Sequence, residues 1–189
     1  MATLLVPGYG GSGPEHWQTW FERQLPDSIR VSQLDCMTLD LPAWTAAIRW
    51  EIDRASEPVW IVAHGFGCLA AVQAASDFSD RVSGAMLVAP YDPDSVRATA
   101  LLPETPLEFP SLMVSSTNNP YMRSDRAAFW AGFWNSAFVS TGAAGAIDPE
   151  AGFGPWQQGL EFFDHLKASS MAHVFSSSGQ RVARTALAV

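Results

Sequence analysis

Short apolar segments alternate with amphipathic segments along this chain of 189 residues. The apolar segments have the length and the continuous hydrophobic character of strands that are buried on both faces of a parallel sheet. The clearest of them are Ala2–Val6, Val59–Ala63, Val82–Ala89 and Ser111–Ser116. Ile29–Leu34 alternates more weakly, as an edge strand does, and Phe138–Thr141 predicts a short sixth strand.

In the intervals, apolar residues recur at the spacing of a helix. The predicted helices run from about Glu15 to Leu25, from Pro42 to Ile52, and over Phe66–Ser76, Tyr121–Phe133 and Trp156–Ala168. This alternation predicts an α/β fold, with a mostly parallel sheet between two layers of helices. We expect a single domain over residues 1–168. Residues 169–189 would form a C-terminal extension, with a short helix after Ser176–Gly179.

Composition and charge exclude several classes of protein. Hydrophobic residues make up 48% and charged residues 16% of the chain, which is ordinary for a globular protein and unlike a disordered one. The net charge of −8 argues against a nucleic-acid partner and against an anionic membrane surface. The N-terminal segment lacks the features of a signal peptide, and no apolar run reaches the roughly 18 residues that span a bilayer. We therefore expect a cytoplasmic protein.

The chain offers little for metals or redox chemistry. Its two cysteines, Cys36 and Cys68, favour buried free thiols, with a disulfide left open. Its four histidines are scattered, and no Cys-x-x-Cys occurs. The sequence thus predicts no metal site and no cofactor, and it does not indicate an oligomeric state.

One stretch has no clear periodicity over about 19 residues, Tyr91–Phe109, a length typical of a lid or a pocket wall. Ligands of parallel α/β sheets bind beyond the carboxyl ends of the strands, near the point where strand order reverses. We expect the loops after strands one, three, five and six to converge there on one crevice.

The segment Val59–Ala70 predicts a buried strand, a tight turn and the start of a helix. This is the layout of a nucleophile elbow, in which a small-x-Ser-x-Gly motif lifts a serine above the sheet. The chain has Ala63-His64-Gly65-Phe66-Gly67 instead, so glycine occupies the apex.

With these motifs, the chain resembles the small α/β-hydrolases of the retinoblastoma-binding-protein and YdeN type, a family of serine hydrolases of about this length. The resemblance runs from Val6 to about Leu166. It is carried by Val6–Tyr9 with Gly11–Gln18, Leu87–Pro90, Pro110–Leu112, Ser115–Ser116, Asn118–Tyr121, Gly142–Ile147 and Gly152–Trp156. It implies a three-layer fold whose sheet of about six strands has the order 2-1-3-4-5-6.

The resemblance also assigns the catalytic positions. The family's serine, acid and histidine fall on Gly65, Asn119 and Ala146, none of which can perform those roles. The backbone amides of Tyr9 and Phe66 would still form an oxyanion hole.

Other residues are candidates to replace the missing serine, acid and histidine. Strand alternation predicts that His64 points away from the crevice as a buried, hydrogen-bonded histidine, although its place beside the apex keeps it a candidate lining residue. We expect Cys68 to pack between helix and sheet, Asp148 to stabilise a turn, and His16 to support the first loop. Further candidates for lining the crevice are Gly8, Tyr91, Tyr121 and Asp148.

A dinucleotide site is a weaker interpretation of the first loop. Gly8, Gly10 and Gly13 meet the G-x-G-x-x-G spacing, but Pro14 follows at once, and Asp35 is only a weak candidate for a ribose acid.

The leading hypothesis is a serine-hydrolase homologue that lacks serine hydrolase activity, a pseudoenzyme whose crevice binds a small molecule or a protein. The alternative is an active carboxylester-type hydrolase that uses non-standard residues. A third hypothesis is a chain so diverged that no function remains.

Overall fold

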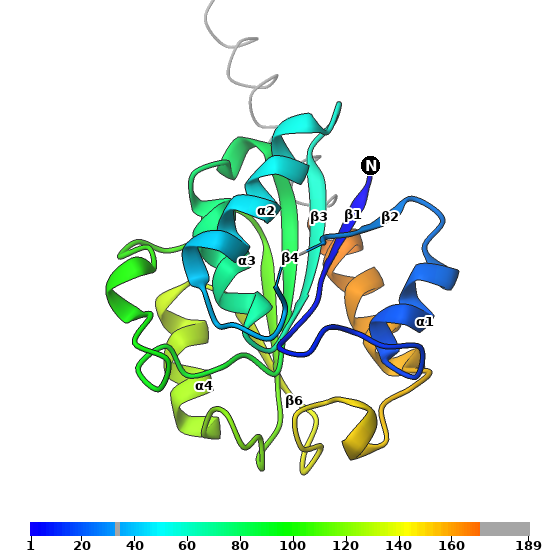
Figure 1. Ribbon diagram of the computed structural model, residues 1–189, viewed down its shortest axis with the longest axis vertical. Coiled ribbons are helices and arrows are strands. Elements are labelled where there is room, and N and C mark those ends of the chain that lie inside the picture. Colours follow the sequence, from blue (N-terminus) through cyan, green and yellow to red (C-terminus); the bar gives the residue numbers. More distant parts are fainter. Residues whose placement is uncertain (33–34, 171–189) are drawn as a thin grey trace, which may run out of the picture.

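A parallel sheet forms the centre of the computed structural model, which describes residues 1–32 and 35–170 (Figure 1). Its strands are β1 (Thr3–Val6), β2 (Ser28–Arg30), β3 (Val59–His64), β4 (Val82–Val88), β5 (Ser111–Ser115) and β6 (Ala137–Ser140). Within these described residues the six strands have the order β2-β1-β3-β4-β5-β6. The predicted fold class and strand order are confirmed.

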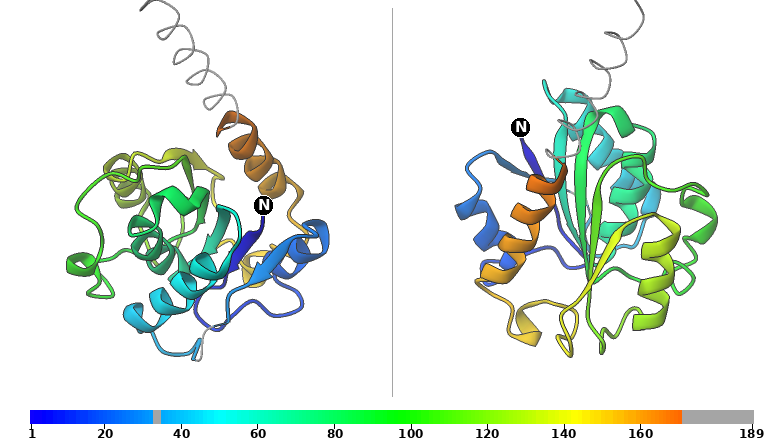
Figure 2. Two further views of the ribbon diagram at one scale, coloured as in Figure 1. Left: turned by 90° about the horizontal axis from the view of Figure 1, so that it is seen from above. Right: turned by 180° about the vertical axis from the view of Figure 1, so that it is seen from behind.

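Helices cover both faces of this sheet. They are α1 (Trp17–Gln24), α2 (Leu41–Arg54), α3 (Gly67–Ser76), α4 (Ser124–Phe133) and a last helix that is described over residues 157–170. The 3-10 turns are η1 (Ser79–Arg81), η2 (Thr99–Leu101) and η3 (Pro149–Ala151). Figure 2 shows α2, α3 and α4 on one face, and α1 with the last helix on the other.

Each face has its own hydrophobic core, as a sheet buried on both sides requires. The core under α2, α3 and α4 contains the fully buried Trp44 and Trp134, whereas the core under α1 and the last helix contains Trp17 and Phe163. Burying a large aromatic side chain removes much apolar area from water, so these residues hold the layers together.

Three predicted elements differ from the observed ones. The second strand is only Ser28–Arg30, and residues 33 and 34 of the predicted strand lie outside the described residues. The first helix begins at Trp17, because the side chain of His16 caps it. The helix predicted from Tyr121 begins at Ser124, since the Asn119 side chain accepts a hydrogen bond from the Tyr121 amide and holds a turn there.

The aperiodic stretch Tyr91–Phe109 is partly packed into the core. Ala98, Leu102, Leu107 and Phe109 are buried in the core under α2, α3 and α4. Of the expected lid or pocket wall, Tyr91 alone among these residues lines the cavity described below.

The two cysteines are both free. Cys68 is fully buried, and burial raises the pKa of its thiol. Cys36 is only half-buried, so the expectation of two buried thiols was wrong for Cys36.

None of the helices in the described ranges has both the length and the apolar character that a bilayer crossing requires. The expected helix after Ser176–Gly179 lies outside the described residues.

The turn between β3 and α3 depends on two glycines. Gly65 has a φ of +54°, in the left-handed region that L-residues avoid, and its amide donates a 3.0 Å hydrogen bond to the Val88 carbonyl of β4. At Gly67, a Cβ would lie 2.3 Å from the Pro7 carbonyl oxygen, so only glycine lets α3 approach the end of β1. The structure thus has the tight strand-turn-helix geometry that the sequence predicted.

Replacing Gly65 by alanine is expected to lower the free energy of unfolding by about 1 kcal/mol, because a left-handed backbone strains an L-residue. The added methyl group has space, since its nearest neighbour, Tyr91 Cε1, would be 3.5 Å away. Denaturant unfolding measures the change. Gly132→Ala in α4 is the matched control: nothing lies within 4 Å of its added Cβ, and helix propensity should raise stability by about 0.5–1 kcal/mol. An unchanged or higher free energy of unfolding for Gly65→Ala would contradict a strained turn at Gly65.

Candidate functional site

A cavity of about 250 Å³ lies beyond the carboxyl ends of the strands. Loops after β1, β3, β4, β5 and β6 contribute to it, and β1 and β3 flank the point where strand order reverses. Its lining residues are Gly8, Tyr9, Gly11, Gly13, His16, His64, Gly65, Ala89, Tyr91, Tyr121, Ala146, Asp148, Pro149 and Glu150.

The cavity brings together two of the three positions that the resemblance assigned to catalysis. Gly65 and Ala146 both line it. Asn119 does not: it is buried, its Nδ2 donates to the Pro90 carbonyl at 3.2 Å, and its Oδ1 accepts from the Tyr121 amide at 3.0 Å. Asn119 therefore fixes the loop that carries Tyr121.

The two residues of the predicted oxyanion hole differ in that Phe66 is not among the lining residues. Tyr9 lines the cavity. Phe66 is the N-cap residue of α3, and its ring is buried against Trp44 and Tyr91. Amides at the start of a helix have no acceptor within the helix and favour negative charge.

His64 lines the cavity, contrary to the expectation that its side chain points away from it. Strand alternation does place His64 on the α1 face of the sheet, where its ring lies 5.8 Å from that of Trp17. The cavity extends over that face because the loop around Ala146 crosses above it. His64 is buried and hydrogen-bonded, as predicted, with its Nε2 2.8 Å from the Ala146 carbonyl oxygen.

Both histidines of the cavity have a lowered pKa, and each has one ring nitrogen engaged with the backbone. A carbonyl oxygen can only accept, so His64 carries its proton on Nε2 and donates it to Ala146. His16 Nδ1 accepts from the Gln18 amide at 3.1 Å. Burial, and then the charge of His64 and Arg30, lowers the pKa of His16 to about 3. Burial also lowers the pKa of His64, although Ala146 and Asp148 oppose this shift.

The loop that carries Ala146 is positioned by residues that sequence reasoning missed. Ser116 Oγ accepts from the Ala144 amide at 2.9 Å, and Asn118 Oδ1 accepts from the Gly145 amide at 2.7 Å. From the opposite side, Trp17 Nε1 donates to the Ile147 carbonyl at 2.8 Å. Ile147 adopts a φ of +51°, which is rare for a β-branched residue and shows that this loop is held in a strained form.

Gln18 is a second residue whose role was missed. It is fully buried, and its Nε2 donates to the carbonyls of Val6 at 3.0 Å and Val62 at 3.2 Å. Ser12 Oγ donates to its Oε1 at 2.5 Å. The signal in the sequence was a glutamine directly after an apolar tryptophan in a predicted amphipathic helix.

The remaining candidates have structural partners. Cys68 Sγ lies 3.4 Å from the Val88 carbonyl and does not line the cavity. Asp148 lines the cavity and also caps η3, accepting from the Ala151 amide at 2.9 Å. Asp35, the weak candidate for a ribose acid, accepts from Met37 and Thr38 instead and does not line the cavity.

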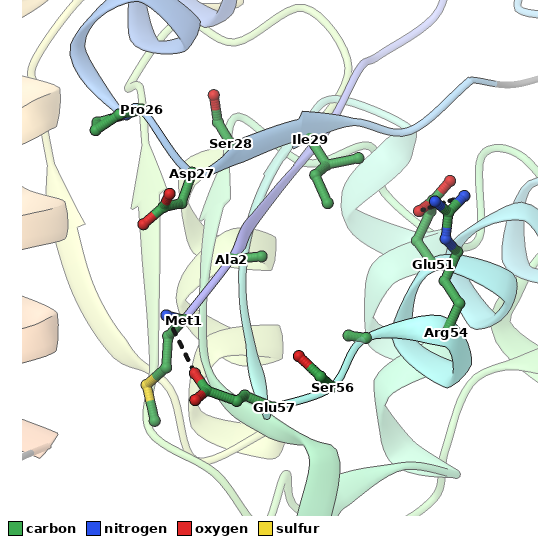
Figure 3. Close-up of a pocket in the computed structure, with 11 residues that line it drawn as sticks. Met1, Ala2, Pro26, Asp27, Ser28, Ile29, Glu51, Arg54, Ser56 and Glu57 are labelled. Carbon is green, nitrogen blue, oxygen red and sulfur yellow. Dashed lines mark ion pairs between the residues drawn. The ribbon is translucent and has the colours of Figure 1, made fainter.

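A larger hollow of about 660 Å³ lies at the opposite edge of the sheet, where the strands begin (Figure 3). There the N-terminal ammonium group pairs with Glu57 at 3.3 Å, and Glu51 lies beside Arg54. Ligands of parallel sheets bind at the other edge, and the glycine-rich turns and buried histidines are there too. We therefore take the smaller cavity as the candidate site.

The chemistry of this cavity is limited by its side chains. Among the described residues that line it there is no serine, threonine, cysteine or lysine, so it has no hydroxyl of serine or threonine, no thiol and no amine to act as a nucleophile. No group of three histidine, cysteine or acidic side chains within the described ranges is arranged to hold a metal ion. The cavity offers aromatic rings, carboxylates and backbone amides, which are groups that bind.

Comparisons with known proteins agree with this fold. A family model described as serine hydrolase matches residues 3–165. A proposed YdeN-like hydrolase from Pectobacterium atrosepticum is 38% identical, with a TM-score of 0.85 over 89% of this chain and 91% of that chain. No curated protein matches the chain.

Two more distant structures share the fold. The ydeN gene product of B. subtilis is 14% identical, with a TM-score of 0.73 over 88% of this chain and 98% of that chain. Est1E of Butyrivibrio proteoclasticus, solved with ferulic acid bound, is 12% identical, with a TM-score of 0.65 over 92% of this chain and 90% of that chain.

The neutral state of His16 predicts a loss of stability in acid. The unfolded chain protonates this histidine near pH 6.5, whereas the folded chain does so only near pH 3, so proton uptake favours unfolding between these values. From pH 7 to pH 5, His16 should remove roughly 2 kcal/mol from the free energy of unfolding. His16→Asn keeps a good N-cap without a titrating group, so its stability should fall less by about that amount.

Denaturant unfolding of both proteins at pH 5 and pH 7 measures this difference, and NMR of the imidazole carbons reports the protonation state directly. Equal losses of stability in the two proteins, or a His16 resonance that titrates near pH 6.5, would show that burial does not hold His16 neutral.

Proposed function

The chain belongs to the serine hydrolase family, and on that basis we propose that it is a member without serine hydrolase activity, whose crevice binds a small molecule. The observation that carries the proposal is Gly65 at the apex of the strand-turn-helix, in the cavity where the family's nucleophile is expected. Glycine has no side chain and cannot attack an acyl group.

The other two positions support the same conclusion. Acyl transfer needs a base to take the proton of the nucleophile, and Ala146 cannot be that base. It also needs an acid to orient the base, and Asn119 is uncharged and engaged with Pro90 and Tyr121. Loss of nucleophile and base together costs several orders of magnitude in rate.

The groups that remain favour binding. Hydrogen bonds of Ser116, Asn118 and Trp17 to the loop around Ala146 hold the wall of the cavity. The amides of Tyr9 and Phe66 would donate hydrogen bonds to a carbonyl or hydroxyl oxygen of a ligand. We further propose the cytoplasm as its compartment, in keeping with two cysteines that are both unpaired.

The alternative, an active carboxylester-type hydrolase, would need a residue of the cavity to activate water. His64 is the histidine next to the apex, but its Nε2 is bonded to the Ala146 carbonyl and burial lowers its pKa, which makes it a weak base. The arrangement therefore supports the alternative less well.

No serine of the purified protein should react with a fluorophosphonate probe, because no serine lines the cavity among the described residues. Intact-mass spectrometry after incubation should show no added mass, while an active serine hydrolase treated in parallel is labelled completely. Stoichiometric labelling at one serine, mapped by peptide sequencing, would support the active alternative and end the present proposal.

The triple variant Gly65→Ser, Asn119→Asp, Ala146→His is expected to hydrolyse p-nitrophenyl acetate measurably, with a rate far above the sum of the three single variants. Triad members act as a unit, and a serine hydroxyl without a base stays protonated. Asn119→Asp alone should destabilise the protein by about 1–3 kcal/mol, since the Pro90 carbonyl loses its donor and faces a carboxylate.

Steady-state rates of the wild type, the three single variants and the triple variant test this prediction, with thermal unfolding as the check that each is folded. A folded triple variant that is no faster than Gly65→Ser would show that positions 65, 119 and 146 do not form a triad geometry.

A further inference from the structure

All three tyrosines of the chain line the candidate cavity. Tyr91 and Tyr121 are stacked, with ring centroids 4.1 Å apart and an interplanar angle of 16°. Tyr91 is 8% exposed and forms the inner wall, beside Gly65, whereas Tyr9 and Tyr121 are 46% and 44% exposed and form the mouth. One small cavity thus has three electron-rich rings, and they come from three separate loops.

The charges around this cavity have one sign. Asp148 and Glu150 line it, and no lysine or arginine is among the described residues that do. His16 and His64 add no positive charge, because burial keeps both neutral. Arg30, whose charge acts on His16, is paired with Glu22 at 2.7 Å. The ionised side chains that line the cavity are therefore all acidic.

We propose that this cavity binds a small organic cation, a primary amine or a quaternary ammonium ion. Aromatic faces attract cations through their quadrupole, most strongly where water is excluded, and nearby carboxylates add a direct charge interaction. The volume of about 250 Å³ suits a ligand of this size, and the residues Gly65 and Ala146 leave space at its floor. This inference rests on the proposed function, since it names the class of ligand of the same site.

Other ligand classes fit the lining less well. An anion would meet Asp148 and Glu150 without a basic side chain to balance them. A neutral ligand would gain the contact area but neither the cation–aromatic nor the carboxylate interaction. The amides of Tyr9 and Phe66 suit an oxygen atom elsewhere on the same cation, such as a hydroxyl or carbonyl group.

The test is whether choline binds to the full-length protein. Isothermal titration calorimetry measures the affinity, and NMR chemical shifts locate the bound choline. Its neutral carbon isostere, 3,3-dimethylbutan-1-ol, has the same shape without the charge, and acetate serves as the anion. We expect choline to bind at least about tenfold more tightly than either, with shifts at Gly65 and Ala146.

Variants assign the binding to the tyrosines and carboxylates. Tyr121→Leu and Glu150→Gln change exposed residues at the mouth, and each should weaken choline binding about fivefold or more, whereas Tyr121→Phe, which keeps the ring, should weaken it less. Phe129→Leu and Glu57→Gln are matched controls, because both positions are exposed and lie outside the cavity, and they should leave the affinity unchanged.

Equal binding of choline and its isostere, tighter binding of acetate, or no binding of choline at millimolar concentration would each overturn the inference. Binding of the isostere or acetate at Gly65 would do so while leaving the proposed function intact. Fluorophosphonate labelling of a serine would instead contradict the proposed function, whatever the affinity for choline.

Discussion

The side chain of Gln18 holds together the part of the sheet from which the cavity is built. It is fully buried, and its amide nitrogen donates to carbonyls of both β1 and β3, the two strands that flank the reversal of strand order. A buried amide or carbonyl group without a partner costs about 1–3 kcal/mol, so a glutamine at this depth is retained only with its full set of bonds. These bonds fix the start of α1 against the ends of both strands.

The rest of the site follows from this anchor. Ser12 donates to Gln18, and Thr19 Oγ1 donates to the Ser12 carbonyl at 3.0 Å, so the glycine-rich turn after β1 has one defined path. His16 is placed by the Gln18 amide, and its ring lies 4.8 Å from that of His64. The burial of both imidazole rings therefore follows from the hydrogen bonds of Gln18, Ser12 and Thr19.

The sequence predicted the sheet well because its strands are continuous apolar runs, a local signal that burial on both faces produces. The sequence also predicted the strained turn at Gly65, because the backbone of such a turn requires glycine, and this requirement is visible in the sequence. It did not predict the direction of His64 relative to the cavity, because that depends on a loop more than 80 residues away. Nor did it predict the role of Asn118 and Ser116, whose partners are backbone amides that carry no side-chain signature.

The path of residues 91–109 could not be predicted from the sequence pattern either. Leu102, Leu107 and Phe109 are spaced irregularly, and prolines interrupt them, so they predict neither a helix nor a strand. Their burial is decided by the space that α3 and α4 leave open on that face of the sheet, which is a property of the assembled layers.

The hydrogen bond from Trp17 to Ile147 joins residues 130 positions apart and closes the cavity wall between the first helix and the loop after the last strand. Contacts of such long sequence separation form late, because the entropy of closing the intervening chain is lost before they can contribute. A nascent chain that has not yet emerged past β6 therefore has no cavity. Any ligand of the finished site would bind the native state alone, and it would shift the folding equilibrium of the whole domain by mass action.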